Sequence, residues 1–315
     1  MDALCKHPVV AVVGPTASGK TALSIALAKR FHGEIVSCDS MQIYRGLDIG
    51  TAKATTEEQQ AVPHHGIDIC SPEQVFSVAD FVQYAAQKEQ ELFARGQLPI
   101  LCGGTGLYVQ SFLDGVRFTA EKTDPGVRQT LQAELEQRGA QAMYEELLQV
   151  DPQAAAQIHP NNTVRVLRAL EHYRSTGQTL SEQKLDSIPE QKPYRSLVLC
   201  LNFADRQKLY ERIDRRVDLM LQQGVLEEAY RVYQNRHTYR TAAQAIGYKE
   251  FFPYFEQTQT LEGCVAKLKQ ASRNYAKRQL TWFRRMENVI WLDAQAPDEV
   301  VAAAVDRVER FLKES

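Results

Sequence analysis

The fold is decided by the stretch Val9-Val10-Ala11-Val12-Val13-Gly14-Pro15-Thr16-Ala17-Ser18-Gly19-Lys20-Thr21, in which a buried-strand run leads into the pattern G-x-x-x-x-G-K-[ST]. The helical segment 21–28 follows directly, so the glycine loop joins a strand to the N-terminus of a helix. The backbone amides of such a loop point inward and the helix dipole favours negative charge. Lys20 adds a positive charge and Thr21 offers a hydroxyl to Mg2+. Residues 14–21 are therefore expected to form a P-loop that holds a diphosphate or triphosphate group.

The composition is that of an ordinary globular protein. Of the 315 residues, 44% are hydrophobic and 24% are charged, and the net charge of −2 provides no overall basic field for a nucleic acid. Contacts to nucleic acid must therefore come from local patches. The six cysteines are scattered without a C-x-x-C pair, which favours buried thiols over a disulfide framework or a zinc site. We expect a cytoplasmic protein without a membrane segment.

Strands and helices alternate in the first third of the chain. Short apolar strands are expected at 9–13, 34–37 and 98–102, and a helix is expected from Ser77 to about Gly96, where Ser77 and Asp80 form a capping box. This alternation predicts a parallel sheet with helices on both faces.

The pattern becomes purely helical between residues 121 and 191. The pairs Asp124-Pro125 and Asp151-Pro152 are typical helix starts in this region, and apolar strands return at 197–201 and 289–292. We therefore predict an α/β fold with a P-loop NTPase-like parallel sheet core, residues 1–120 and 196–315. An all-helical subdomain, residues 121–195, is inserted into this core.

Two strand ends could carry chemistry. Asp39 ends the second strand, where the carboxylate could be a Mg2+ ligand, a general base or only a cap. The turn Gly103-Gly104-Thr105-Gly106 follows the third strand, where Thr105 could meet a ligand or belong to a plain turn. An ordinary ATPase would carry an Asp directly after that strand, and its absence disfavours ATP hydrolysis.

Two helices carry basic residues at regular spacing. Arg212 and Arg216 lie four residues apart and therefore on the same face of a helix. This face could either clamp a pyrophosphate group or be a solvated surface with salt bridges. In the late helix 261–286, four basic residues fall on one stripe that is either a phosphate track or a soluble surface: Lys269, Arg273, Lys277 and Arg284. The opposite side should pack inward through Leu268, Tyr275, Trp282 and Met286. His64, His65 and His159 match no standard metal site.

Taken together, these motifs resemble those of the bacterial tRNA dimethylallyltransferases, the tRNA isopentenyltransferase or IPP transferase family. The resemblance covers nearly the whole chain and rests on the P-loop and on the blocks 39–53, 63–65, 103–108, 165–171, 245–250 and 276–284. The block that begins Asp39-Ser40-Met41-Gln42 is far more specific than a P-loop alone. Cys38 stands where the family usually has a smaller residue, and Ala54 stands where a proline is usual.

The resemblance implies transfer of a dimethylallyl group from its diphosphate to N6 of adenosine-37, next to the anticodon of tRNA. It implies Mg2+ as cofactor and the tRNA anticodon stem-loop and dimethylallyl diphosphate as partners. We expect the protein to be a monomer. Asp39 is then the general base, since an exocyclic amine needs one. Arg216 and the P-loop stabilise the departing diphosphate, with Mg2+ on Thr21. The resemblance places four residues in catalysis: Thr16, Asp39, Thr105 and Arg216.

The resemblance also implies a set of tRNA contacts. They comprise Asp39, Ser40, Met41, Gln42, Thr105, Arg128, Val164, Arg165, Val166, Leu167, Arg168, Ile246, Gly247, Tyr248, Lys249 and Lys277. Three alternatives stay open at this point. One is an adenylate dimethylallyltransferase that acts on free AMP, ADP or ATP. Another is a P-loop small-molecule kinase, and the third is an RNA-binding P-loop protein without catalysis.

Overall fold

The computed structural model describes residues 6–118 and 125–314. The chain divides into two compact units, of which the first comprises Met1–Asp114 and Lys192–Ser315 and the second Gly115–Gln191. The boundaries expected from the sequence were 120/121 and 195/196. Asp124, which the sequence places at a helix start, lies outside the described residues.

A parallel sheet forms the centre of the first unit, and the predicted fold class is confirmed. Its strand order is β3-β2-β4-β1-β5-β6, and every described pairing is parallel. The strands are β1 (Pro8–Val13), β2 (Gly33–Ser37), β3 (His64–His65), β4 (Leu98–Gly103), β5 (Arg195–Asn202) and β6 (Val289–Asp293). The two-residue strand β3 is the only one of these that the sequence did not predict, because it is too short to show a pattern.

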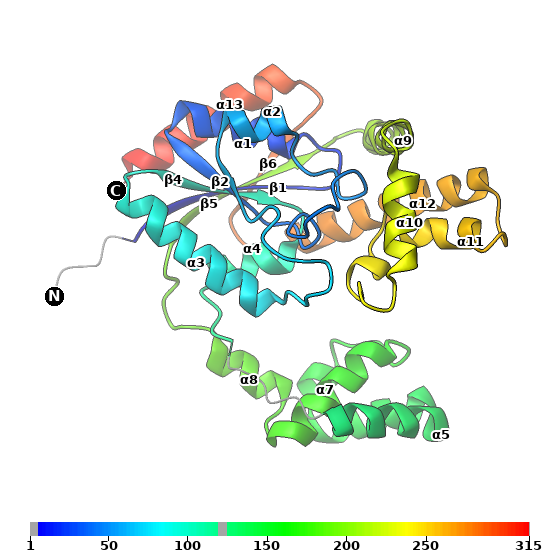
Figure 1. Cartoon of the computed structure of the whole chain (residues 1–315). Helices are drawn as coiled ribbons and strands as arrows, with labels where there is room; N and C mark the ends of the chain where they lie inside the picture. Colours follow the sequence, from blue (N-terminus) through cyan, green and yellow to red (C-terminus); the bar gives the residue numbers. More distant parts are fainter. Residues whose placement is uncertain (1–5, 119–124, 315) are drawn as a thin grey trace. The chain divides into compact units, whose positions relative to one another are not determined.

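Successive residues of β1 point to opposite faces of the sheet, and each face has its own core. Val10 and Val12 pack with α1 (Lys20–Arg30) and α13 (Pro297–Lys313). Val9, Ala11 and Val13 pack with α3 (Val78–Ala94) and α4 (Gly106–Leu113). Figure 1 shows these helix pairs on the two sides of the sheet. The continuous apolar run of β1 follows from this double burial.

A third core lies at the carboxyl ends of the strands. It joins the segment after β2, through buried Ile43 and Tyr44, to helices of the second half of the chain. The helices of this region are α9 (Arg206–Gln222), α10 (Val225–Gln234), α11 (Phe252–Phe255) and α12 (Leu261–Phe283), with short 3-10 turns at Ala242–Gln244 and Lys249–Phe251. The short α2 (Thr56–Ala61) lies between β2 and β3 along the chain. The capping box that the sequence predicts for α3 is confirmed, since Ser77 and Asp80 bond each other's backbone amides.

The described part of the second unit is helical. It contains α5 (Pro125–Val150), α6 (Pro152–Ala155), α7 (Thr163–Thr176) and α8 (Leu180–Ser187). Gly139, with φ of 78°, breaks α5, and Asp151 caps α6 through the amide of Ala154 as expected. A separate core forms between α5 and α7 around Met143, Leu147 and Leu170. Among the described residues, no helix has the length and apolar character that crossing a membrane requires.

Candidate active site

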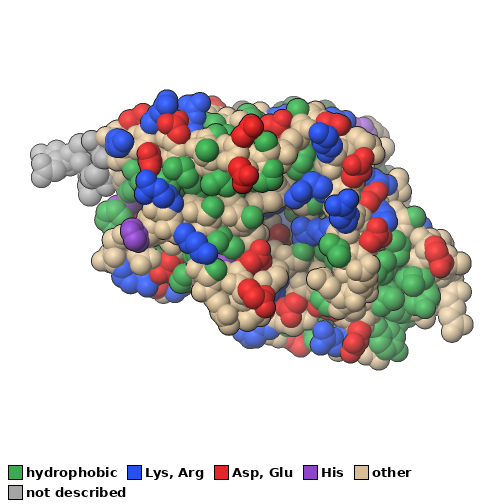
Figure 2. All heavy atoms as spheres, turned by 90° about the horizontal axis from the view of Figure 1, so that it is seen from above, with side chains coloured by type: hydrophobic (Ala, Val, Ile, Leu, Met, Phe, Trp, Pro, Cys, Tyr) green, Lys and Arg blue, Asp and Glu red, His purple; other side chains and the backbone are tan. Residues whose placement is uncertain are grey.

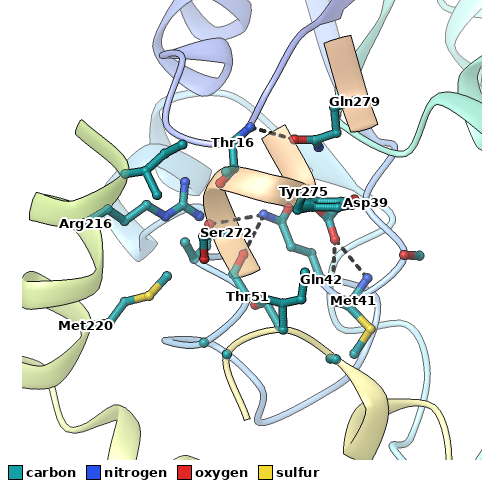
Figure 3. Close-up of a pocket in the computed structure, with 18 of the residues that line it drawn as sticks. Thr16, Asp39, Met41, Gln42, Thr51, Arg216, Met220, Ser272, Tyr275 and Gln279 are labelled. Carbon is teal, nitrogen blue, oxygen red and sulfur yellow. Dashed lines mark hydrogen bonds between the residues drawn. The ribbon is translucent and has the colours of Figure 1, made fainter. Parts of the chain in front are cut away.

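A cavity of about 320 Å³ opens in the first unit beside the carboxyl ends of β1, β2 and β4 (Figure 3). Three P-loop residues line it: Thr16, Lys20 and Thr21. The segment 39–42 after β2 and the 50–52 turn form further parts of the wall, with residues of α9 and α12. Ligands of open parallel α/β sheets bind at this edge, because the loops that follow the strands converge there.

The P-loop conformation depends on its glycines. Gly14 has a φ of 143°, and a Cβ there would lie 2.6 Å from the carbonyl oxygen of Leu201. The Lys20 Nζ donates a hydrogen bond of 2.7 Å to the carbonyl of Pro15. Burial lowers the pKa of Lys20 to about 8, and the nearby Arg216 acts in the same direction, while the charge of Asp39 opposes both. The loop therefore holds a desolvated ammonium group that an anion would stabilise in its charged form.

Asp39 serves as a cap and also lines the cavity. Its Oδ1 accepts hydrogen bonds from the amides of Met41, at 2.9 Å, and Gln42, at 3.4 Å. Its Oδ2 has no hydrogen bond within residues 6–118 and 125–314, and the side chain is half-buried in the cavity wall. Of the three interpretations left open by the sequence, the cap is thus compatible with either of the other two, a Mg2+ ligand or a general base. One oxygen fixes the segment 39–42, and the other is available to a ligand.

The two arginines of α9 have different surroundings. Arg216 lines the cavity and makes no hydrogen bond or ion pair with any residue that the structure describes. Burial lowers its pKa, and the charge of Asp39 acts in the opposite direction. Arg212 is exposed, and its Nε donates to the carbonyl of Ala17 in the P-loop at 2.8 Å. Of these two arginines, Arg216 is therefore the one that is available to bind an anion in the cavity.

Two cavity residues on α12, Tyr275 and Gln279, were missed as site residues by the sequence analysis. The Gln279 Oε1 accepts from the amide of Thr16 at 2.9 Å, and its Nε2 donates to the carbonyl of Gly104 at 3.0 Å. Gln279 thus ties the P-loop to the turn after β4. Burial, with the charge of Asp39, raises the pKa of Tyr275 to about 12. The inward-facing stripe of α12 was the signal that could have identified Gln279, since it lies one turn after Tyr275.

Glu228 of α10 is a third residue that the sequence did not single out. Its carboxylate is 3% exposed and accepts hydrogen bonds from the amides of Asp48, Ile49 and Gly50 and from the hydroxyl of Tyr248. The distances lie between 2.8 and 3.1 Å. Glu228 therefore holds the turn that continues into the cavity wall at Gly50.

Replacing Glu228 with alanine is expected to lower the free energy of unfolding by about 3 kcal/mol, because the buried hydroxyl of Tyr248 and three partly buried backbone amides lose their acceptor. Urea denaturation of the purified variant would measure this loss. The neighbouring Glu227 is exposed, and Glu227→Ala should cost less than about 1 kcal/mol. Equal losses in the two variants would contradict the role of Glu228.

Three of the residues expected to contact RNA have buried side chains: Val166, Leu167 and Tyr248. Val166 and Leu167 of α7 are 1% and 2% exposed and belong to the core of the helical unit. Tyr248 is fully buried, and burial raises its pKa, with the neighbouring carboxylate of Glu228 acting in the same direction. In each case the residue lies in a conspicuous motif but points away from the surface. Five of the expected RNA contacts are exposed: Val164, Arg165, Arg168, Lys249 and Lys277.

The remaining expected contacts lie in partly enclosed surroundings. Ser40, Met41, Gln42, Ile246 and Gly247 line the cavity. Thr105 does not line it, and its hydroxyl accepts from the amide of Ser40 at 3.2 Å. Arg128 forms an ion pair of 2.6 Å with Glu171 in the helical unit.

The basic stripe of α12 is not continuous. Lys269 pairs with Asp218 at 2.6 Å and Arg273 pairs with Asp214 at 2.5 Å, so both are neutralised by α9. Lys277 and Arg284 are exposed and have no ion pair among the described residues. Figure 2 likewise shows acidic and basic side chains interspersed over one face of the molecule. The inward side agrees with expectation, since Leu268 is buried, Trp282 and Met286 pack against the sheet core, and Tyr275 lines the cavity.

No cluster of three or more His, Cys, Asp or Glu side chains with the geometry of a metal site is found in the described parts of the chain. The cavity does present the Thr21 hydroxyl and the Asp39 carboxylate, which are the hard oxygen donors that Mg2+ accepts. Mg2+ in phosphate sites takes one or two protein oxygens and completes its coordination with water and substrate phosphate. The donor set therefore fits a magnesium ion that arrives with a diphosphate.

The fold and the cavity define a class: a P-loop α/β protein in which Lys20, Asp39 and Arg216 line one cavity at the carboxyl edge of a parallel sheet. Residues 42–286 match the family model described as IPP transferase, and residues 7–68 match the one described as isopentenyl transferase. The chain belongs to the IPP transferase family.

Curated and solved relatives agree with this assignment. The chain is 50% identical over 292 residues to the tRNA dimethylallyltransferase of Bacillus subtilis, covering 93% of this chain and 92% of that protein. The crystal structure of a tRNA isopentenylpyrophosphate transferase from Bacillus halodurans is similar at a TM-score of 0.73, with 44% identity and 98% of each chain covered. A eukaryotic dimethylallyltransferase acting on tRNA superposes with a TM-score of 0.80 at 29% identity, covering 96% of this chain and 80% of that one.

Proposed function

We propose that this protein transfers the dimethylallyl group from dimethylallyl diphosphate to N6 of adenosine-37 of tRNA, giving N6-(dimethylallyl)adenosine and diphosphate. The observation that carries the proposal is the meeting of the P-loop, Asp39 and Arg216 around one cavity. The relatives named above support it, because they carry this activity in their names.

The chemistry requires a base and a stabilised leaving group. The N6 lone pair attacks C1 of the dimethylallyl group, the C1–O bond breaks, and its electron pair leaves with the diphosphate. The amine becomes acidic as its bond to carbon forms, and Asp39 Oδ2 takes the proton. The Oδ1 bonds to Met41 and Gln42 keep the carboxylate oriented during this transfer.

Negative charge builds up on the diphosphate as it leaves. Lys20, Arg216 and the P-loop amides stabilise this charge, and they do so best when they are already in position. The Thr21 hydroxyl would hold Mg2+, and the ion would supply additional positive charge to the leaving group. Thr16 stays in place through Gln279. The P-loop in this proposal holds a leaving group instead of transferring a phosphoryl group.

The tRNA substrate has to present its base outside the stack, as anticodon loops can. The exposed side chains Val164, Arg165 and Arg168 of α7 and Arg128 of α5 are the proposed contacts of the helical unit with the anticodon stem-loop. In the first unit these contacts are Lys249, Lys277 and the cavity segment 39–42. Thr105 supports that segment through Ser40. We further propose that the enzyme is a cytoplasmic monomer.

A transfer assay with radiolabelled dimethylallyl diphosphate and Mg2+ tests the proposal, with unmodified tRNA and AMP offered in parallel. Label on tRNA alone supports it. Label on AMP would instead indicate a nucleotide-modifying enzyme. Hydrolysis of ATP without transfer of label would indicate a phosphoryl-transfer enzyme.

The affinity for dimethylallyl diphosphate is expected to fall above about pH 8. The Lys20 pKa is lowered to about 8, so the free enzyme loses this positive charge as the pH rises through that value. Each further pH unit should then raise the Kd up to roughly tenfold. Calorimetric titration without tRNA, from about pH 7 to about pH 9.5, measures the effect. In Lys20→Arg, which stays charged, the Kd should be flat over this range. A flat Kd in the wild type would contradict the role of Lys20.

Lys277→Ala is expected to weaken tRNA binding and to reduce the salt dependence of log K by about one unit, as the loss of one phosphate contact requires. Filter binding at several salt concentrations measures the slope. Lys269→Ala is the matched control, because Lys269 is already paired with Asp218 and should leave the slope unchanged. An unchanged slope in Lys277→Ala would place this part of α12 away from the RNA.

A further inference from the structure

One face of α9 forms a wall of the cavity that changes from cationic to apolar along the helix. Ile213, Arg216, Val217 and Met220 all line it, at the i, i+3, i+4, i+7 spacing of a single helix face. Figure 3 shows the side chains of Arg216 and Met220 leaving the same helix toward the cavity. The wall is therefore cationic at Arg216 and apolar one turn further along. This order matches a ligand that has an anionic group at one end and a short hydrocarbon chain at the other.

The apolar end of this wall is closed by packed core. Met220 is 8% exposed, and Leu268 of α12 and Ala245, which also line the cavity, are 1% and 9% exposed. All three belong to the buried cluster that contains Tyr44 and Val225. A ligand that extends past Met220 would therefore have to displace core side chains, which costs free energy because interiors are tightly packed.

We infer that Met220 sets the length of the allylic chain that this enzyme accepts, an inference that rests on the proposed function. With the diphosphate at the P-loop and Arg216, the hydrocarbon runs along α9. Arg216 and Met220 lie about 6 Å apart along the helix axis. This is close to the extended length of one isoprene unit. Dimethylallyl diphosphate, with one unit, fits in front of Met220, and geranyl diphosphate, with two, meets its side chain.

A methionine at position 220 is suited to limiting the length of the bound chain. Methionine is unbranched and can be shortened without a change in backbone conformation. Its neighbour Leu219 is 49% exposed and does not line the cavity. Met220 and Leu219 therefore form a matched pair on one helix. Replacement by alanine removes a cavity side chain at Met220 and a surface side chain at Leu219.

The test compares dimethylallyl and geranyl diphosphate as donors to tRNA in the wild type, Met220→Ala, Met220→Val and Leu219→Ala. The ratio of kcat/KM for geranyl to that for dimethylallyl should rise about 10-fold or more in Met220→Ala, since a pocket that gains space for methylene groups changes discrimination by this order. Met220→Val should give an intermediate ratio and Leu219→Ala the wild-type ratio. Thermal melting of each variant confirms that it is folded.

An unchanged ratio in folded Met220→Ala and Met220→Val would overturn the inference. A raised KM for tRNA with an unchanged donor ratio would also overturn it, and would place Met220 against the adenine. These outcomes are distinct from a failure of the proposed function, in which wild-type protein would transfer no dimethylallyl group to tRNA at all.

Discussion

Replacing Asp39 with alanine is expected to lower the single-turnover rate of dimethylallyl transfer by about 10²–10⁴ while the Kd for tRNA changes only a few-fold. The reason is the loss of a positioned base at the atom that must give up its proton. Rapid-quench measurements with saturating tRNA and dimethylallyl diphosphate would give the rate, and filter binding would give the Kd.

The cap formed by Asp39 makes a second variant necessary. Asp39→Asn keeps an Oδ1 that can accept from the amides of Met41 and Gln42, so it preserves the cap and removes only the base. We therefore expect Asp39→Asn to be nearly as slow as Asp39→Ala. Near-normal transfer by Asp39→Asn would show that Asp39 acts through its cap. A large loss of tRNA affinity with normal chemistry would exclude it as the base.

Arg216→Ala is expected to lower the rate of transfer by about 10²–10³, which is the usual effect of removing one group that stabilises developing charge. The guanidinium lines the cavity and makes no hydrogen bond or ion pair with the residues that the structure describes, so its donors are available to an anion. Arg216→Lys should recover part of the rate, because a lysine keeps the charge but loses the planar, forked donor.

Arg212→Ala provides the control for this experiment. Arg212 lies one turn earlier on α9 and is exposed, and its bond to Ala17 supports the P-loop from outside. Its loss should slow transfer by less than about tenfold. Similar losses in the two variants would mean that both arginines clamp the diphosphate, as the sequence alone allows.

The elements that carry a strong local signal are predictable from the sequence. β1, β4, β5 and β6 are apolar runs long enough to read directly, and Ser77 and Asp151 cap helices where the sequence places them. The P-loop and Asp39 belong to the same group, because each follows directly after a strand and so must lie at its carboxyl end.

The supporting residues of the site could not be predicted in the same way. Gln279 bonds Thr16, and Glu228 bonds the turn at Gly50, across separations of 263 and 178 residues. No local pattern indicates such pairings. The motifs that contain Val166, Leu167 and Tyr248 did not reveal that these side chains are buried, because membership in a motif does not indicate exposure. For α7, the helical spacing of Val166, Leu167 and Leu170 is a pattern from which an inward face could have been predicted.

The position of β1 in the sheet has a consequence for synthesis on the ribosome. β1 pairs with β4 on one side and with β5 on the other, and β5 begins only at Arg195. A nascent chain that has completed the P-loop and Asp39 therefore still exposes an apolar strand edge, which is prone to aggregation until β5 arrives. The Gln279 bond to Thr16 forms later still. A prematurely terminated product would contain the entire P-loop motif yet be a substrate for proteolysis rather than a partial enzyme.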